Sequence, residues 1–323
     1  MRSKPFVTGA LGALALVLVP AAIAGNGGFA PPEPQSPNAD RINDTYYYIA
    51  IFTGVIFVLV EGALLWFVYK YRRGRRLRTE DGPQVHGNTR LEIAWTVVPV
   101  LIVTAIAAFV FYELPGIADI PPATAAGGRE DVRVVGYRFY WQFEYPNGAI
   151  AVDQMRAPVG TNMKLDVTAP DWDVIHSWWI PELGGKIDAI PGTVNHTWFN
   201  AKRAGVFNGQ CAELCGIQHA KMTASVEALP RAEYEAWLEE RARGVGLGEE
   251  TFIGACGKCH GLAGEGDIGP RLAGTALVED PDAVEQIVRN GRGLMPPLGQ
   301  DWSDEQMDAL TTYLREELGG GTS

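Results

Sequence analysis

Two long apolar segments dominate the first third of the chain. They cover about residues 46–69 and 94–112, and each is long enough to cross a bilayer as a helix. Aromatic residues flank the first segment, as they do at both faces of a membrane. The arginine-rich residues 72–78 follow directly, and positive charge in a short loop marks the cytoplasmic side. The pattern predicts a transmembrane helical hairpin over residues 46–116, with everything beyond it outside the cytoplasm.

The residues before the hairpin are typical of an exported protein. Residues 1–24 combine a basic start, an apolar stretch and a small-residue cleavage site, which predicts a secretory signal peptide. An uncleaved anchor helix is the alternative for the same residues. Residues 25–45 are rich in Gly, Pro, Asn and Asp, and we expect an extended extracytoplasmic lead-in there.

The middle of the chain has the pattern of β-strands. Residues 132–145 are rich in Val, Tyr, Phe and Trp, and residues 163–168 alternate apolar with polar side chains. Turn signals built from Pro, Asn and Gly separate these runs. The pattern predicts an all-β domain over residues 117–230.

Helical patterns return after residue 230. Residues 231–246 are charged and end in Gly, which predicts a helical linker. A second, smaller soluble domain follows over residues 247–323, and within it residues 304–318 predict a helix that Ser303 caps. We expect this helix to pack across the helix that leads into Cys256.

Charge and cysteine content narrow the classes of partner. The 323 residues carry a formal net charge of −11, which argues against nucleic acid and would suit a basic electron donor. All four cysteines, Cys211, Cys215, Cys256 and Cys259, fall in two short motifs. No cysteine is left for a structural disulfide, so both motifs are candidates for redox chemistry.

The first motif gathers soft metal ligands. Twelve consecutive positions carry two thiols, an imidazole and a thioether: Cys211, Cys215, His219 and Met222. A second imidazole is available upstream at His176. Sulfur combined with imidazole favours copper and electron transfer. A disulfide or a zinc site would use the two cysteines, but neither explains Met222 or Gly216 at their offsets.

The second motif is the C-x-x-C-H signature of covalent haem attachment. Cys256 and Cys259 would form thioethers to the haem, and His260 would bind the iron. Met295, in a Met-Pro-Pro segment, is the candidate for the second axial ligand, because a Met/His pair raises the haem potential as electron carriers require. Met307 and Met222 are poorer candidates, because Met307 lies in a predicted helix and Met222 already belongs to the first motif. A thioredoxin-like or zinc-binding pair is the alternative for the two cysteines.

The first motif closely resembles the copper-A loop of cytochrome c oxidase subunit II, and the match runs from the first apolar span to about Leu229. The resemblance implies a cupredoxin-like Greek-key sandwich with the copper loop between its last two strands. It implies two bridging thiolates, two terminal imidazoles, a weak thioether ligand and a weak main-chain carbonyl ligand: Cys211 and Cys215, His176 and His219, Met222, and Glu213. It also places the Glu213 side chain at a magnesium ligand on the boundary with subunit I.

Further positions carry expectations from the same family. Glu92 lies where the family has a glutamate at the mouth of a proton channel, and it also suits a helix N-terminus on electrostatic grounds. Tyr140 and Trp141 fit the family's aromatic electron-input region, whereas Phe139 replaces the Trp that receives electrons from soluble cytochrome c. Glu61 lies inside the first apolar span, where a buried carboxylate is costly, and its role stays open.

The C-terminal domain resembles class I cytochrome c, an all-α fold. The segment Gly269-Pro270-Arg271-Leu272 carries this resemblance beyond the haem motif itself. It implies that the Pro270 carbonyl accepts the ring proton of His260 and so fixes the orientation of that ring.

The chain as a whole therefore resembles a multidomain membrane protein, a subunit II of cytochrome c oxidase with a fused cytochrome c. The resemblance implies a bacterial cell membrane location, with copper-A and haem c on the outer face. Electrons would come from an external donor, such as a cytochrome bc complex or a small cytochrome. They would pass through the haem and the copper to subunit I, where oxygen is reduced with proton translocation, and subunit III is a further expected partner.

Two other functions remain open. The chain could deliver electrons to a copper-A nitric oxide reductase. It could also be a membrane-anchored copper or redox carrier, or a sensor, without an enzymatic partner. The oxygen-reducing site lies in another subunit on every oxidase interpretation, because this chain has only two spans and no candidate haem–copper centre.

Overall fold

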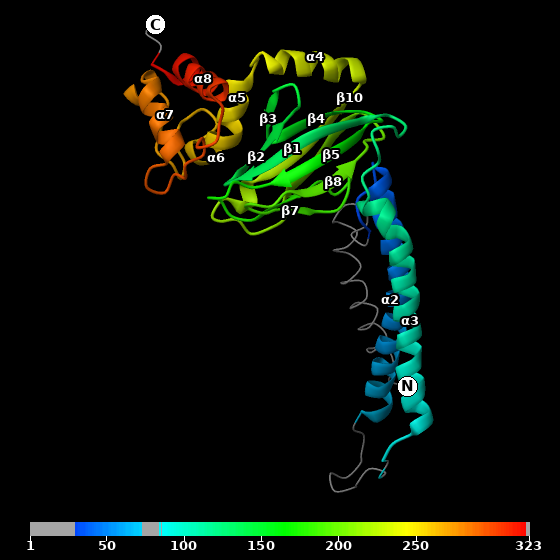
Figure 1. Cartoon of the computed structure of the whole chain (residues 1–323). Helices are drawn as coiled ribbons and strands as arrows, with labels where there is room; N and C mark the ends of the chain where they lie inside the picture. The colour runs from blue at the N-terminus through cyan, green and yellow to red at the C-terminus, as the bar shows by residue number, and fades with distance from the viewer. Residues whose placement is uncertain (1–29, 73–83, 85, 321–323) are drawn as a thin grey trace, which may run out of the picture. The chain divides into compact units, whose positions relative to one another are not determined.

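The structure, a computed structural model, describes residues 30–72, 84 and 86–320. The predicted signal peptide and most of the arginine-rich loop lie outside the described residues. The chain divides into two compact units, with residues 40–119 in one and the remaining described residues in the other. The first unit is a helical hairpin, and the second holds a β-sandwich and a set of short helices (Figure 1).

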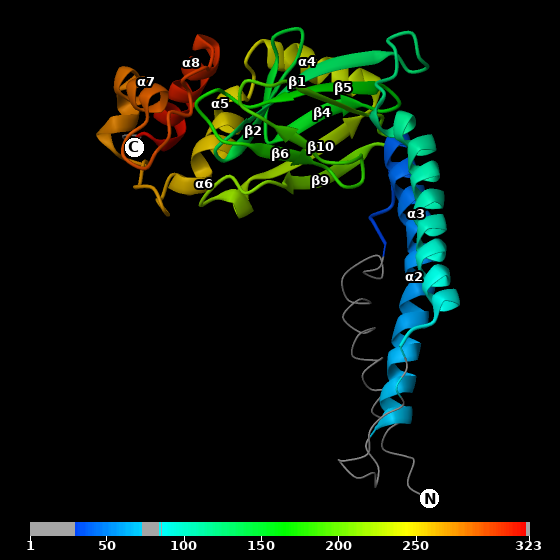
Figure 2. The ribbon, with the colours of Figure 1, turned by 60° about the horizontal axis from the view of Figure 1, so that its bottom comes forward.

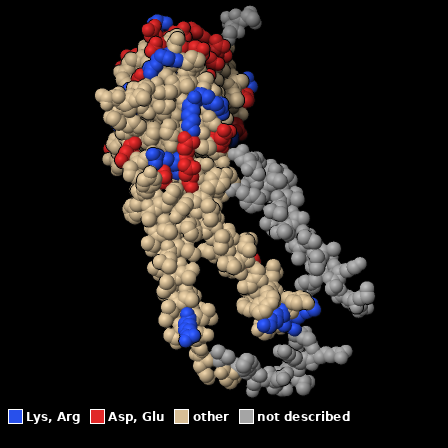
Figure 3. Space-filling model, turned by 90° about the vertical axis from the view of Figure 1, so that its right-hand side faces the viewer, with Lys and Arg blue, Asp and Glu red and all other residues tan. Residues whose placement is uncertain are grey.

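Two helices of the hairpin are long and apolar enough to cross a membrane. They are α2, Pro37–Tyr71, and α3, Thr89–Ala118. On the face that Figure 3 shows, uncharged residues cover most of both helices. The two helices contact each other through stacked rings of Tyr48 and Phe109, 4.1 Å apart, and through an Arg41–Glu113 ion pair of 2.9 Å. The predicted two-helix hairpin is therefore present.

Both helices extend beyond the predicted spans. Helix α2 begins at Pro37, inside the segment for which we expected an extended lead-in. A proline at the first helical position suits a helix start, because its missing N–H would be unpaired there in any case. Helix α3 begins after Asn88, whose side chain accepts a hydrogen bond from the Leu91 N–H.

Ten strands form two five-stranded sheets within residues 129–229, all of which the structure describes. The strands are β1 Arg129–Tyr137, β2 Tyr140–Glu144, β3 Ile150–Val152, β4 Gln154–Pro158, β5 Asn162–Thr168, β6 His176–Trp179, β7 Ile187–Ala189, β8 Asn195–Phe199, β9 Gly205–Cys211 and β10 Thr223–Leu229. The sheet orders are β3-β2-β1-β5-β8 and β4-β10-β9-β6-β7. The β1–β5 and β4–β10 pairs are parallel and the other pairs are antiparallel.

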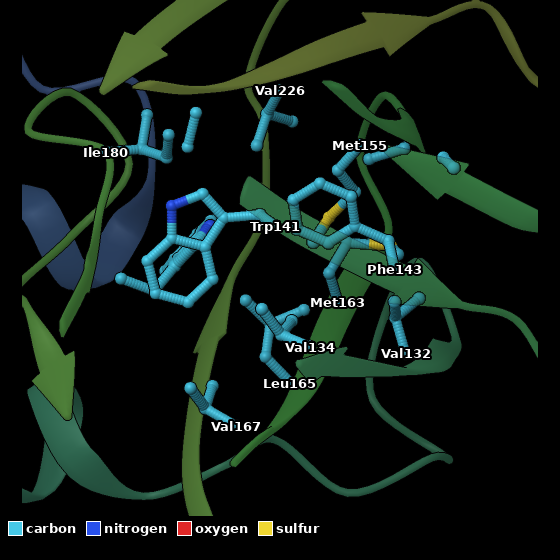
Figure 4. Packing of buried hydrophobic residues seen from close by; sticks show 14 of the residues in the cluster. Val132, Val134, Trp141, Phe143, Met155, Met163, Leu165, Val167, Ile180 and Val226 are labelled. Carbon is cyan, nitrogen blue, oxygen red and sulfur yellow. The ribbon is translucent and has the colours of Figure 1, made fainter. Parts of the chain in front are cut away.

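The sandwich core lies between the two sheets. In β5 every second side chain, Met163, Leu165 and Val167, is fully buried, as the alternating sequence predicts. Figure 4 shows these side chains packed with Trp141 and Phe143. Burying such side chains stabilises the sandwich by about 1.5–3 kcal/mol each. The sandwich is therefore a rigid support for the loops at its ends.

Short helices make up the rest of the second unit. They are α4 Arg231–Ala242, α5 Leu247–Thr251, η3 Phe252–Cys256, α6 Gly257–His260, η4 Ala276–Glu279, α7 Pro281–Asn290, α8 Asp304–Tyr313 and η5 Leu314–Leu318. Figures 1 and 2 show those after α4 gathered at one end of the sandwich. Ser303 caps α8 by accepting a hydrogen bond from the Gln306 N–H.

Helix α8 packs across α5, as we expected. A Cβ atom at Gly248 would lie 2.1 Å from the carbonyl oxygen of Ala309, so only glycine allows this close approach. The rings of Phe252 and Tyr313 complete the contact, with centroids 5.6 Å apart. The all-α character predicted for the C-terminal domain is confirmed.

Candidate redox sites

The copper motif lies on the loop that joins β9 to β10. Strand β9 ends at Cys211, and Cys211 pairs with Trp178 of β6. His176 begins β6, so the pairing of these strands brings it beside the loop although it lies 35 positions earlier. The Cys211 N–H donates to the Met222 carbonyl at 2.8 Å and closes the base of the loop.

The two cysteine sulfurs lie at the centre of the cluster. The Sγ atoms of Cys211 and Cys215 are 3.9 Å apart. Cys211 Sγ lies 4.0 Å from His176 Nδ1, and Cys215 Sγ lies 3.6 Å from His219 Nδ1. An imidazole nitrogen therefore lies within about 4 Å of each sulfur. His176 is fully buried and both cysteines are nearly so.

Two weaker donors complete the cluster. Met222 Sδ lies 3.7 Å from Cys215 Sγ, and the Glu213 carbonyl oxygen lies 3.2 Å from Cys211 Sγ. The structure thus brings together all six residues that the sequence motif singled out. A disulfide needs sulfurs about 2.05 Å apart, so these two thiols are unbonded. The donor set of two sulfurs with separate imidazoles fits a pair of copper ions.

The thiols and the buried imidazole affect one another's ionisation. The hydrogen bond with Cys215 lowers the pKa of Cys211 well below its ordinary value, and the same contact raises the pKa of Cys215. Burial alone would lower the pKa of His176, but the neighbouring Asp173 carboxylate outweighs burial and raises it. Metal ions bind thiolates and neutral imidazoles, so metal binding at this cluster would release protons and would depend on pH.

Asp173 is a buried carboxylate beside His176 that the sequence motifs did not single out. Its Oδ1 atom lies 3.6 Å from Nε2 of His176 and 2.7 Å from Nε of Arg138. Metal-binding histidines usually present their second ring nitrogen to a carboxylate, which holds the ring in place. The available signal was its position three residues before His176.

The aromatic residues near the copper loop have different surroundings. The Trp141 ring is edge-on to the His176 ring, with centroids 6.0 Å apart, and Phe139 faces the loop at Gly216. Tyr140 accepts a hydrogen bond from Trp302 Nε1 at 2.8 Å. Tyr140 and Trp141 are fully buried in this chain, so an external protein cannot touch either ring.

The haem motif lies on the short helical segment that ends at His260. His260 Nδ1 lies 2.7 Å from the Pro270 carbonyl oxygen. Gly269 lies flat against the same ring, because a Cβ atom there would be 2.8 Å from the ring atoms. Burial raises the pKa of Cys256 to about 12 and also raises the pKa of Cys259. A thioredoxin-like pair requires a lowered thiol pKa, so these cysteines do not fit that alternative.

Met295 lies on a tight turn beyond α7. Its N–H and carbonyl bond to the backbone of Arg292 at 3.1 and 3.0 Å. Met295 packs against the apolar cluster that contains Cys256, while its neighbour Leu294 is 94% exposed. Met307 is buried within α8, as its predicted helical position requires.

Two carboxylates of the hairpin were singled out by sequence. Glu92 lies in the first turn of α3, where Oε1 accepts the Asn88 N–H at 3.2 Å. That contact satisfies one of the unpaired donors at the helix start. Glu61 lies within α2 with its side chain on the surface of the hairpin unit.

Three family models match consecutive parts of the chain. They are the transmembrane domain of cytochrome c oxidase subunit II at residues 25–112, its periplasmic domain at 149–229, and subunit III of the cbb3-type oxidase at 245–314. Cytochrome c oxidase subunit 2 of Alkalihalophilus pseudofirmus is 35% identical over 307 residues, which cover 88% of this chain and 89% of that protein. The chain belongs to the cytochrome c oxidase subunit II family.

Other members of the subunit II family give consistent matches. Cytochrome c oxidase subunit 2 of Cereibacter sphaeroides is 33% identical over 297 residues, or 76% of this chain and 94% of that protein. The solved periplasmic domain of subunit II from Bradyrhizobium japonicum is 32% identical and covers 39% of this chain and 98% of that domain, with a TM-score of 0.36.

This subunit II is membrane-anchored, with an outward-facing cupredoxin-like domain and a C-terminal cytochrome c domain. It is a subunit of an oxidoreductase, the haem–copper oxidase.

Proposed function

We propose that this chain is the subunit through which electrons enter a respiratory cytochrome c oxidase. It passes them from an external donor through its c haem to a dinuclear copper-A centre, and on to subunit I, where oxygen is reduced with proton translocation. The main support is the cluster on the β9–β10 loop, in which neighbouring sulfur and imidazole donors lie within about 4 Å of one another.

Each residue of the loop has a distinct task in this proposal. Copper, when bound, supplies one-electron redox chemistry. Cys211, Cys215, His176 and His219 would hold the two copper ions. Met222 and the Glu213 carbonyl are weak ligands. Because the thiols and His176 are buried, the loop excludes water from the ligand atoms.

The outer rim of the loop suits a contact with subunit I. Leu214 and Ile217 are 77% and 76% exposed and lie on either side of Cys215. Apolar side chains this exposed, beside a metal loop, favour burial against another protein. The Glu213 side chain is exposed on the same rim and is the proposed magnesium ligand at that boundary.

The haem residues divide their work in a similar way. Cys256 and Cys259 would attach the haem covalently, and His260 and Met295 would hold its iron. The Pro270 carbonyl holds the His260 ring through its Nδ1–H and leaves Nε2 for the iron. Glu92 is proposed to lie at the mouth of a proton channel in subunit I. The proposed setting is a bacterial membrane that also holds subunit III.

Purification of the full-length chain from its native membrane tests this function. We expect subunit I to co-purify, with two coppers and one covalent haem per copy of this chain, and with oxygen consumption from reduced cytochrome. Cys215→Ser should remove the copper and the turnover while leaving the haem. Turnover of nitric oxide but not oxygen would contradict the oxidase assignment. A chain that purifies alone, or that holds zinc, would contradict delivery of electrons to any enzyme.

A further inference from the structure

The haem attachment turn lies directly on the sandwich. Lys258, between the two haem-binding cysteines, is only 12% exposed in its side chain. Its Nζ atom lies 2.5 Å from Asp153 Oδ2 and donates to the Phe139 carbonyl oxygen at 2.8 Å. Asp153 and Phe139 both belong to the sandwich, so this ammonium group joins the two domains.

Asp153 is built into the sandwich as a receptor for that ammonium group. It has a φ of 60°, a left-handed conformation that few residues other than glycine adopt. Its Oδ1 atom accepts the Trp141 N–H at 3.0 Å, and its own N–H donates to the Trp141 carbonyl at 2.8 Å. These bonds fix the carboxylate and leave Oδ2 for Lys258.

Burial makes each partner depend on the other. The Lys258 and Asp153 side chains are only 12% and 21% exposed, so each charge is largely removed from water and relies on the other. Removing one member of a buried ion pair leaves an uncompensated charge, which is far more costly than removing both.

The backbone of Lys258 contacts the copper loop. Its carbonyl oxygen accepts a hydrogen bond from Gln218 Nε2 at 3.3 Å and lies 3.5 Å from Lys221 Nζ. Gln218 is buried and precedes His219 directly in the sequence. Lys221 also pairs with Asp267 of the haem domain at 3.0 Å. The haem attachment turn is therefore one hydrogen bond away from the neighbour of a copper-site histidine.

Apolar packing continues across the same boundary. One buried cluster includes Tyr140 and Val152 of the sandwich together with Phe252 and Trp302 of the haem domain. The fit is close at Gly254, where a Cβ atom would lie 2.4 Å from Val152 Cγ1. The contact between the domains is therefore a packed interface and not a single surface ion pair.

We propose that Lys258 is a positioning residue for electron transfer within the chain. Its contact with Asp153 and Phe139 holds the haem attachment turn against the copper loop. The hydrogen bond from Gln218 then links the turn to that loop. The contact therefore sets the rate of electron transfer from haem to copper. This inference rests on the proposed function. The step moves one electron from haem to copper, and no bond is formed or broken. The rate of electron tunnelling falls steeply as the distance between the two centres grows. If the haem attachment turn moves away from the sandwich, electron transfer therefore becomes slower.

The test uses the full-length chain with both centres loaded. A light-activated dye reduces the haem in a flash, and the optical change then reports transfer to copper. We expect Lys258→Met to slow transfer by roughly tenfold or more, because an unpaired Asp153 favours separation of the domains. Asp153→Asn should slow it similarly. The double variant should recover most of the rate, since it leaves no buried charge unpaired.

Matched controls separate positioning from other effects. Lys202→Met removes an exposed lysine of the sandwich outside this interface and should leave the rate within twofold, about 0.4 kcal/mol. Gly254→Val should slow transfer without changing any charge, because its side chain would collide with Val152. The potentials of both centres, measured by spectroelectrochemistry, should stay the same in Lys202→Met and Gly254→Val, which leave the buried ion pair intact. Hydrogen exchange at β3 should become faster in Lys258→Met and Gly254→Val.

The outcomes distinguish this inference from the function on which it rests. If the unaltered chain holds both centres but moves no electron between them, the proposed function fails. If it transfers rapidly and Lys258→Met transfers equally fast, only the role of Lys258 is overturned. The role of Lys258 would also be overturned if Lys258→Met slows transfer and the double variant with Asp153→Asn remains equally slow.

Discussion

The copper loop and the haem segment are assembled in opposite ways. The copper loop is held by pairing between distant strands: β9 delivers Cys211, β10 follows Met222, and β6 supplies His176. The haem segment is local, since Cys256, Cys259 and His260 lie within five residues. The helical runs of the described haem domain are short: α5, η3 and α6 are continuous over 247–260, α7 covers Pro281–Asn290, and α8 continues through η5 to Leu318.

The two sites therefore obtain their rigidity from different parts of the structure. Isolated helices of up to about 15 residues are marginal in water, so the haem domain depends on packing, on its cofactor and on its contact with the sandwich. The sandwich has its own closed core and can hold the copper loop ready before metal binds. Variants of the two regions should therefore fail in different ways.

Loss of a bridging thiol should have the largest and most local effect. Cys215→Ser removes a thiol that both copper ions of the proposed centre would share, so we expect the copper signal to disappear completely. The haem spectrum and the sandwich fold should persist, because neither uses that sulfur. Electron paramagnetic resonance and circular dichroism on the same sample measure both. Loss of the haem signal together with the copper signal would contradict the expectation that the two sites fail separately.

A cavity in the haem domain should act on that domain alone. Leu310 is fully buried in α8, and Leu310→Ala should cost about 2–5 kcal/mol of unfolding free energy. We expect the haem absorbance to change at lower denaturant while the copper signal stays. The control is Leu294→Ala, which truncates an exposed side chain and should change stability by at most about 0.5 kcal/mol. Equal loss of both signals would show that the domains unfold as one.

Removing the carboxylate beside His176 should weaken the copper site without abolishing it. Asp173→Asn keeps the size of the side chain but removes the charge that holds the ring, so copper affinity should fall by about 10–100-fold. Competition with a copper chelator measures this. Asp171→Asn, an exposed neighbour, serves as the matched control. An unchanged affinity would exclude Asp173 from supporting the site.

The smallest change in stability is expected from a charged pair on the surface of strands β5 and β8. Burial alone would raise the pKa of Asp166, but bonds to Lys164 and His196 outweigh it and lower the pKa below the ordinary value of 3.8. Because the folded pKa is the lower one, this stabilisation is present above about pH 4 and is lost as pH falls through the folded pKa.

Asp166→Asn should therefore cost at most about 1 kcal/mol at pH 7 and almost nothing in strong acid. Denaturant unfolding of the sandwich at both pH values measures the difference. A larger effect at low pH would reverse the sign and contradict the assignment.

Sequence patterns predict the hairpin, the all-β domain and the helical C-terminal domain because each depends on local periodicity. The spacing of the copper motif likewise locates a cluster whose members, apart from His176, lie on one loop. Local patterns cannot reveal that Lys258 meets Asp153, because only tertiary packing brings them together. The prediction of an extended lead-in was wrong from Pro37 onward, where α2 begins. The composition of that segment resembles that of a loop.

The central claim is that one chain holds a copper pair and a c haem as connected redox centres. The most direct measurement is electron paramagnetic resonance and optical spectroscopy on the full-length chain carrying haem and copper. We predict a low-spin haem together with a hyperfine pattern from one electron shared by two coppers, the latter lost in Cys215→Ser. A mononuclear copper pattern, or no copper signal beside an intact haem, would contradict the account.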